Sequence, residues 1–210
     1  MSDFLEAAIL DHRLGTPYTA DDPLYIAAFT VAPTDAGGGT EVAGGAYARV
    51  AVALANLSRS GSTISNDNIE EFPEATADWG TVVALGTYDA STAGNLLDWD
   101  YAIAQGASWV VGSAQASDTI VAPAHGFSDD DQVVISAIEG YSLPTGVTEG
   151  QQVYVISSTT DTLQLSATQG GAAIDITVAG TLRMALSGQK AIGSGDLLRI
   201  KAGAFQIILT

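Results

Sequence analysis

The chain opens with apolar residues at helical spacing. Ser2 or Asp3 can cap a helix here, and Gly15 is the type of residue that ends one. The pattern therefore predicts one short helix over residues 3–14, whose apolar stripe is a packing face. The stripe consists of Phe4, Leu5, Ala8, Ile9 and Leu14.

Strand patterns dominate the chain after this helix. Apolar, β-rich segments alternate with turns built from Gly, Pro, Ser and Asp. Residues 47–57 fit either a strand or a short helix, and their spacing favours a strand. The apolar arm 204–209 closes a hairpin over 197–209, and we expect it to complete a central strand because such an edge would aggregate. The other strands expected in this part lie at 24–30, 63–65, 79–88 and 95–103.

The segment 112–184 has a pattern of its own, with short strands at regular spacing and polar turns between them. This is typical of a small barrel or sandwich. The strands expected here lie at 119–122, 132–138, 151–157, 162–167 and 173–178.

The predicted fold class is all-β. We expect residues 1–111 and 185–210 to form a β-sandwich or jelly-roll-like domain with the short N-terminal helix. Residues 112–184 are expected to form a small inserted β-barrel-like domain, since a guest domain is tolerated at a loop tip where its two ends lie close together.

Charge excludes several classes of partner. Seven Lys and Arg face 24 Asp and Glu, which gives a formal net charge of −17. A surface this acidic repels phosphate backbones and anionic bilayers, so we expect no nucleic-acid partner and no membrane partner. The chain has no Cys, and neither a signal-peptide pattern nor an apolar stretch of membrane-spanning length is present.

The residues that carry chemistry do not assemble into a catalytic pattern. The two histidines, His12 and His125, lack a nucleophile elbow. Asp129–Asp131 and the group Asp67, Glu70 and Glu71 offer oxygen ligands for Ca²⁺ without EF-hand spacing, and solvated turns are the preferred interpretation. Asp98 and Asp100 share a strand face, which is a hint of glycosidase chemistry, and an exposed or inter-subunit position is the preferred interpretation. We expect no enzyme, no metal and no cofactor.

The aromatic residues Tyr47, Trp79, Trp99 and Trp109 allow two interpretations. They could form a platform on which sugars stack, as a receptor-binding protein needs. The preferred interpretation is that they anchor a core or an interface, because large aromatic side chains dominate both.

Several segments have residue sequences that are more specific than the formation of strands and turns requires. The most specific is Ala32–Val42 together with Gly44–Arg49. These segments resemble a family of small bacteriophage proteins described as tail-fibre-like, over most of residues 1–105 and 190–210. The others are 24–30 after the helix, 72–73 with 75–82, 89–90 leading into 94–97, and the pairs 195–196 and 202–203.

The inserted segment resembles a separate β module of phage structural proteins. Its marks are Ala124–Phe127, Leu143–Gly146, Tyr154–Ser157, Leu163–Ser166 and Gly170–Ala172. The resemblance implies a non-enzymatic virion protein, made in the bacterial host cytoplasm, whose partners are other virion proteins. From the habit of related phage proteins we expect a homotrimer.

Two roles on the particle follow from this resemblance. The leading hypothesis is a capsid decoration or cement protein that stabilises the shell by bridging its subunits. The alternative is a tail-fibre or tail-tip protein that binds a host receptor, such as a glycan, and an enzyme such as a depolymerase is a third option. The candidate interface residues are Tyr47, Arg49, Trp79, Trp99 and Trp109.

Overall fold

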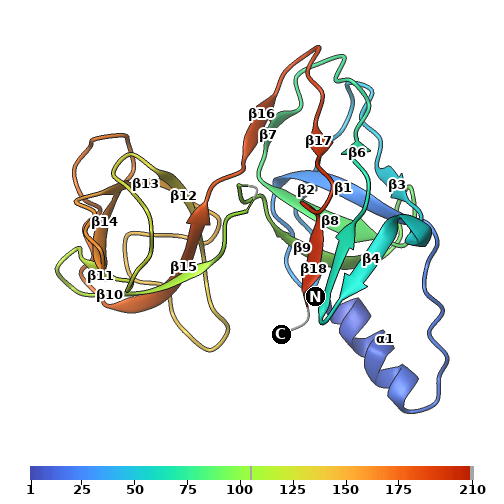
Figure 1. Cartoon of the computed structure of the whole chain (residues 1–210), viewed down its shortest axis with the longest axis horizontal. Helices are drawn as coiled ribbons and strands as arrows, with labels where there is room; N and C mark the ends of the chain where they lie inside the picture. Colours follow the sequence, from blue (N-terminus) through green and yellow to red (C-terminus); the bar gives the residue numbers. More distant parts are fainter. Residues whose placement is uncertain (105, 209–210) are drawn as a thin grey trace. The chain divides into compact units, whose positions relative to one another are not determined.

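The computed structural model describes residues 1–104 and 106–208 (Figure 1). They divide into two compact units, one formed by residues 1–102 with 189–210 and the other by residues 103–188. Strands make up most of the regular structure in both units, so the predicted all-β class is confirmed.

One short helix precedes the sheets, as the sequence predicts. It is α1 (Asp3–Arg13), and the backbone N–H of Leu5 donates to the Ser2 hydroxyl oxygen at 3.2 Å, which caps its first turn. Gly15 follows at φ +99°, a left-handed conformation that ends a helix readily only when the residue is glycine.

The main sheet of the first unit has five antiparallel strands. Its order is β2-β1-β8-β9, and β3 pairs with β1 beside this path. Two register shifts, in the β1–β2 and β8–β9 pairings, interrupt the ladders near the loops that join these strands. The strands are β1 (Leu24–Val31), β2 (Thr40–Glu41), β3 (Val50–Val52), β8 (Ala84–Tyr88) and β9 (Leu96–Tyr101).

Three smaller antiparallel sheets complete the first unit. The pairs are β16 (Lys190–Ile192) with β7 (Gly80–Val82), and β17 (Arg199–Ile200) with β6 (Glu70–Glu71). The third sheet has the order β18-β5-β4, with β18 (Gln206–Ile208), β5 (Thr63–Asn66) and β4 (Leu57–Ser60), and the short 3-10 helix η1 (Leu54–Asn56) leads into it.

A buried core joins the main sheet to these ribbons. Ile26 and Ala28 of β1 contribute one side, while Val82 of β7 and Ile192 of β16 contribute the other. All of them are almost completely removed from water, which is the main favourable contribution to folding. The rest of the buried cluster comprises Val42, Val52, Phe72, Ala75, Trp79 and Ile200.

The second unit is a closed antiparallel barrel. Its order is β10-β11-β14-β13-β12-β15, and β15 pairs with β10 to complete the circle. Closure leaves no unpaired sheet edge. The strands are β10 (Val110–Ala114), β11 (Ile120–Val121), β12 (Gln132–Ser136), β13 (Gln152–Ile156), β14 (Thr162–Ser166) and β15 (Gly180–Leu186).

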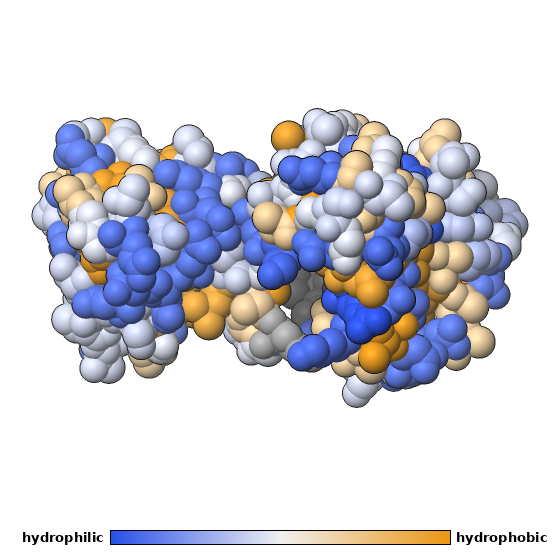
Figure 2. All heavy atoms as spheres, turned by 90° about the horizontal axis from the view of Figure 1, so that it is seen from above, coloured by the Kyte–Doolittle hydropathy of each residue, from blue (hydrophilic) through white to orange (hydrophobic). Residues whose placement is uncertain are grey.

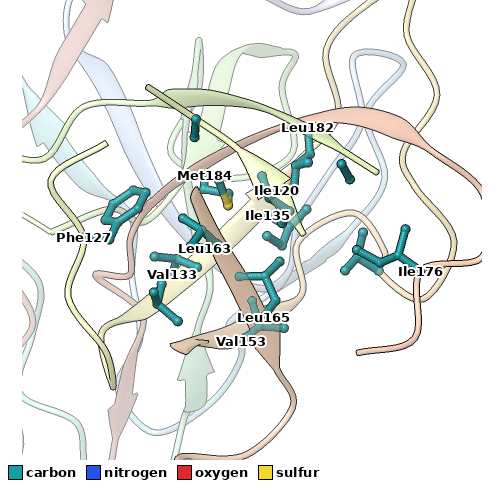
Figure 3. Packing of buried hydrophobic residues seen from close by; sticks show 14 residues of the cluster. Ile120, Phe127, Val133, Ile135, Val153, Leu163, Leu165, Ile176, Leu182 and Met184 are labelled. Atoms are coloured by element: carbon teal, nitrogen blue, oxygen red, sulfur yellow. The ribbon is translucent and has the colours of Figure 1, made fainter. Parts of the chain in front are cut away.

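Aliphatic side chains fill the barrel. Alternate residues of the strands point inward, and Figure 3 shows them meeting at its centre. Ile120, Ile135, Leu163, Leu182 and Met184 are all fully buried. The β-barrel-like character expected for this part of the chain is therefore observed.

The expected strand at 173–178 is wrong. The barrel strand is β15 instead, and 173–178 contributes only a bridge at Ala173. Ile176 fills the core while its N–H donates to Asp118 Oδ1 at 2.7 Å, and the N–H of Val178 donates to Thr145 Oγ1 at 2.9 Å. Side-chain acceptors thus satisfy these two backbone groups in place of a β ladder.

Two other expected elements are divided between sheets. Residues 79–88 form β7 and β8, which belong to different sheets. The closing hairpin is not formed, because β17 pairs with β6 and β18 pairs with β5. Among the described residues β18 lies at the edge of its sheet and not at its centre, and Leu209 lies outside the described residues.

The surface carries both polar and apolar side chains. On the face drawn in Figure 2, hydrophobic residues form small groups among hydrophilic ones. Within the described part of the chain, no helix combines the length and the apolar character that crossing a membrane would require.

The entry and the exit of the barrel unit lie side by side. A bridge joins Ile103 to Ser187, and β10 and β15 run antiparallel to each other from there. The boundaries expected at 111/112 and 184/185 fall inside these two strands. That the barrel is an independently folding inserted domain stays a prediction.

We expect a fragment of residues 103–188 to unfold cooperatively by itself, because its core is made by its own residues. Leu163→Ala should lower the free energy of unfolding of this transition by about 2–5 kcal/mol, in the fragment and in the whole chain alike. Ile26→Ala, in the other unit, is the control and should leave it unchanged. Urea titration followed by circular dichroism measures both, and a fragment without a cooperative transition would contradict the prediction.

Candidate functional site

A buried arginine organises one end of the first unit. Arg49 directly precedes β3, and its side chain is only 7 % exposed. Its Nε donates to Glu41 Oε1 at 2.8 Å and its Nη2 to Glu41 Oε2 at 2.7 Å, a bidentate ion pair. Its Nη1 donates to the carbonyl oxygens of Ala90 and Ala93, both at 2.8 Å. The guanidinium therefore ties β2 to the loop between β8 and β9.

Two tyrosines enclose this ion pair. The Arg49 guanidinium carbon lies 3.5 Å from the centre of the Tyr88 ring, a cation–π contact. The Tyr47 hydroxyl donates to Glu41 Oε1 at 2.9 Å and accepts from the N–H of Ala28 at 2.9 Å. Burial, with a smaller effect of the Glu41 carboxylate, raises the pKa of Tyr47 far above its usual range, so this hydroxyl stays protonated as a donor.

The charge of Arg49 is held firmly. Burial alone would lower the pKa of its guanidinium, but the hydrogen bonds and the charge of Glu41 outweigh this and raise it. Every nitrogen of the guanidinium donates to Glu41 or to a loop carbonyl. The group acts as a clamp on the loops, and we call it, with Glu41, the Arg49 clamp.

Trp79 lies in the core beside this clamp. It is 4 % exposed, and its Nε1 donates to the carbonyl oxygen of Gly45 at 2.9 Å. Its ring packs edge-on against Tyr47 at 5.3 Å between centroids and against Phe72 at 6.4 Å. A Cβ at Gly45 would lie 2.8 Å from Trp79 Nε1, so the glycine is required for this close approach.

An open pocket of about 310 Å³ lies over the clamp. Glu41, Tyr47 and Arg49 form its floor. Ser91 and Thr92 lie at its rim on the exposed tip of the β8–β9 loop. The residues of this tip are exposed, while the charged groups below are bonded to one another and to loop carbonyls.

The remaining candidate residues lie in separate clusters. Trp99 packs against Tyr101 at 5.4 Å, and its Nε1 donates to Asp35 Oδ1 at 3.1 Å. Trp109, in the barrel unit, lies under the Arg183 guanidinium at 4.4 Å. The structure brings together only Tyr47, Arg49 and Trp79 of the five, and Trp79 is too deeply buried to stack on a sugar.

Four of the six acidic residues considered as calcium ligands have structural partners. Asp129 Oδ1 accepts from the N–H of Ser158 at 2.7 Å, and Asp131 Oδ2 accepts from the N–H of Ser128 at 2.8 Å, so these carboxylates hold turns. Asp67 accepts from the Ser58 hydroxyl, and Glu71 is paired with Arg199. Over the described ranges, no group of three or more His, Asp or Glu side chains is arranged to hold a metal ion.

Both histidines also bond within the fold. His12 Nδ1 accepts from the N–H of Tyr18 at 3.3 Å. His125 is 6 % exposed, its Nδ1 accepts from the N–H of Phe127 at 3.0 Å, and its ring stacks on Phe127. The motif Ala124–Phe127 therefore shapes a loop of the barrel.

The comparison with known protein families matches residues 1–120 to the family described as Podophage GP4 fiber I protein gp80. The chain belongs to this phage fibre family. No curated protein matches the chain at a significant level. The resemblance to tail-fibre-like phage proteins is confirmed, and the chain is a phage structural protein and a component of the virion.

The family match places the Arg49 clamp in the shared part of the fibre protein. It covers the first unit up to Ala102 and the strand β10, and it ends at Ile120, the first residue of β11, so most of the barrel lies beyond it. The sequence singled out Arg49 but missed its partner Glu41. The signal was present, because these two are the only charged residues between positions 36 and 58.

We expect Arg49→Met to lower the free energy of unfolding by about 1–3 kcal/mol, because it leaves the half-buried Glu41 carboxylate and two loop carbonyls without their donor. Arg59→Met, at an exposed arginine, is the control and should change it by about 0.5 kcal/mol or less. Thermal or urea unfolding measures both. The single variant Glu41→Gln and the double variant Glu41→Gln/Arg49→Met complete the cycle. If the double variant loses as much free energy of unfolding as the two single variants together, the pair is not coupled.

Glu70 gives a pH-dependent prediction. It is 7 % exposed, its Oε1 has no hydrogen-bond partner, and burial raises its pKa. Because the folded state favours the protonated form, stability falls as the pH rises from the usual glutamate pKa through the raised one. Glu70→Gln should therefore stabilise the fold at pH 7, with a gain that shrinks toward pH 4. Glu71→Gln, which removes the exposed charge next to it, should show no such gain in unfolding experiments across this range.

Proposed function

We propose that this fibre-family protein is a tail-fibre or tail-tip component that binds a receptor on the host cell. The observation that carries the proposal is the match of residues 1–120 to a phage fibre protein. It favours the tail over the capsid, and the capsid decoration role expected from the sequence is not confirmed.

The loop end above the Arg49 clamp supports a recognition role. Receptor binding needs loops that are exposed yet held in one conformation, because ordering them on binding reduces affinity. Asp89 accepts from the N–H and the side-chain amide of Asn95, both at 2.7 Å, and Arg49 holds Ala90 and Ala93. The exposed tip at Ser91 and Thr92 is therefore fixed from below.

The chemistry of this tip suits a polar receptor. Its hydroxyls are exposed, and the pocket beside it is wide and open. A surface glycan, which presents hydroxyl groups, is the receptor class that such a tip would recognise through hydrogen bonds. The proposed role needs no bond to be made or broken, so the protein acts by binding alone and not as an enzyme.

The oligomeric state belongs to the same proposal. The homotrimer expected from the resemblance would present three copies of the loop end, and simultaneous engagement raises avidity without new contacts. Light scattering of the purified chain measures this state directly.

We expect antibody labelling of intact virions to mark the tail. Particles that lack the protein should lose adsorption to the host and keep the heat stability of their capsids. Thr92→Trp should lower adsorption by crowding the loop tip without removing the protein from the particle. Thr168→Trp, on an exposed turn of the barrel unit, is the matched control. If the antibody instead labels the whole icosahedral shell, and capsids that lack the protein are heat-sensitive, the protein is a capsid decoration protein and the tail assignment is wrong.

A further inference from the structure

The Glu41 carboxylate keeps acceptor capacity that the Arg49 clamp does not use. Its Oε1 accepts from the Tyr47 hydroxyl and from Arg49 Nε, while its Oε2 accepts from Arg49 Nη2. An ionised carboxylate offers about four acceptor positions in all. The Glu41 side chain is 26 % exposed and lines the pocket over the clamp. A hydroxyl group placed in this pocket can therefore donate to the carboxylate.

The Arg49 guanidinium offers no comparable site to an anion. Arginine holds a carboxylate or a phosphate through two parallel N–H groups on one edge of the guanidinium. Glu41 occupies the edge formed by Nε and Nη2, and Nη1 donates to the carbonyl oxygens of Ala90 and Ala93. The Tyr88 ring lies against one face of the group, 3.5 Å from its carbon to the ring centre. No edge is left with two N–H groups for an incoming anion.

The other residues of the pocket add no positive charge. Of the described residues that line it, Arg49 is the only Lys, Arg or His. An acidic ligand would therefore bring a second negative charge beside Glu41 and find no cation to pair with it. Like charges placed together in this way are a general means of rejecting a wrong partner.

The size and the remaining lining of the pocket suit a single sugar ring. Its volume of about 310 Å³ lies at the lower end of the range for small-molecule sites. The methyl groups of Ala48 and Ala93 line it, and Ser91 and Thr92 lie at its rim. A sugar ring presents C–H groups on its faces and hydroxyls at its edge, which match methyl groups and hydrogen-bonding side chains in turn.

Ala93 adopts a backbone conformation that usually belongs to glycine. Its φ is +53°, and a Cβ is disfavoured in this left-handed region. Strain of this kind gathers at ligand sites. Ala46 has a similar φ of +64° but is not among the residues that line the pocket. The two alanines therefore share the strain, and only the methyl group of Ala93 is placed to contact a ligand.

We propose that this pocket binds one uncharged sugar unit of the host glycan and rejects acidic sugars. A hydroxyl of the sugar donates to Glu41, and the sugar ring packs on the methyl groups of Ala48 and Ala93. Glu41 is the residue that determines the specificity, because its charge repels a carboxylate, a phosphate or a sulfate while it accepts from a hydroxyl. The inference rests on the proposed receptor-binding role and adds the class of sugar that is bound.

The test uses the purified whole chain and polysaccharide extracted from the surface of the host cell. The polysaccharide is immobilised in three forms: untreated, freed of acidic groups by carboxyl reduction and dephosphorylation, and oxidised with periodate, which destroys neighbouring hydroxyls. We expect the form without acidic groups to bind within about twofold of the untreated form, with no dependence on salt, since salt screens only charges. The oxidised form should bind about tenfold more weakly or not at all.

Two matched pairs of variants locate the site. Ala48→Phe fills the pocket and should raise the dissociation constant about tenfold or more, whereas Ala43→Phe, at an exposed alanine outside the pocket, should change it about twofold or less. Ala93→Gly removes a packed methyl group and should raise the dissociation constant about threefold. It should not lower the melting temperature, because glycine adopts positive φ without strain. Ala46→Gly makes the same change outside the pocket and should leave binding unchanged.

The outcomes separate the possible errors. If only the polysaccharide that keeps its acidic groups is bound, the pocket's preference for an uncharged sugar is wrong and the receptor-binding role stands. If Ala48→Phe is folded by circular dichroism and binds as the unchanged chain does, the pocket is not the sugar site. If no form of the polysaccharide is bound although virions need the chain for adsorption, the receptor is not a glycan and the inference is overturned. If virions that lack the chain adsorb normally, the proposed function itself fails.

Discussion

The ion pair between the buried Arg49 and the half-buried Glu41 is the interaction on which the first unit depends. A guanidinium removed from water is tolerated only when its charge is paired and its donors are satisfied. Here the donors are satisfied by one carboxylate and two loop carbonyls, all about 2.8 Å away. Loss of any of these partners leaves charge or polarity buried, so the pair enforces one arrangement of β2 and the β8–β9 loop.

This constraint explains how a glycine-rich segment can be well defined. Gly37, Gly38, Gly39, Gly44 and Gly45 all have positive φ, and such residues lose much backbone entropy on folding. Glu41 lies within this segment, and Tyr47 and Arg49, which follow it, both donate hydrogen bonds to the Glu41 carboxylate. These bonds fix the segment. A side chain at Gly39 would approach the Val31 carbonyl oxygen to 2.7 Å, which is closer than real Cβ atoms come.

The barrel unit depends on a different kind of constraint. Its core is apolar and its strands close on one another, so each sheet edge is paired within the unit. His125 holds its loop in shape, because its Nδ1 accepts from the N–H of Phe127 in the same loop. Its Nε2 lies 3.4 Å from the carbonyl oxygen of Thr162. A closed barrel whose first and last strands are neighbours can be placed in a loop of a host unit with little disturbance to either. This is the physical basis for the proposed insertion.

Local sequence patterns predicted the elements whose residues carry a strong periodic signal. The helix α1 was found from its cap and its terminating glycine, and β1, β12, β13 and β14 from their apolar runs. The error at 173–178 arose because a buried Ile176 in an irregular segment looks like a strand residue. The partnership of Glu41 with Arg49 depends on tertiary contacts, and the sequence showed the two charges without showing that they meet.

The loop proposed to bind the receptor and the helix α1 are joined through one strand. Ser2 bonds to Leu96 and Leu97 at the start of β9, directly after the loop whose tip carries Ser91 and Thr92. Asp35, which receives the N–H of Asp3, also accepts from Trp99 further along β9. Because these hydrogen bonds tie the start of α1 to the strand that follows the loop, the helix and the loop tip keep one orientation relative to each other. An attached fibre protein needs this property, since a receptor site on a freely turning unit would lose the benefit of several copies acting together.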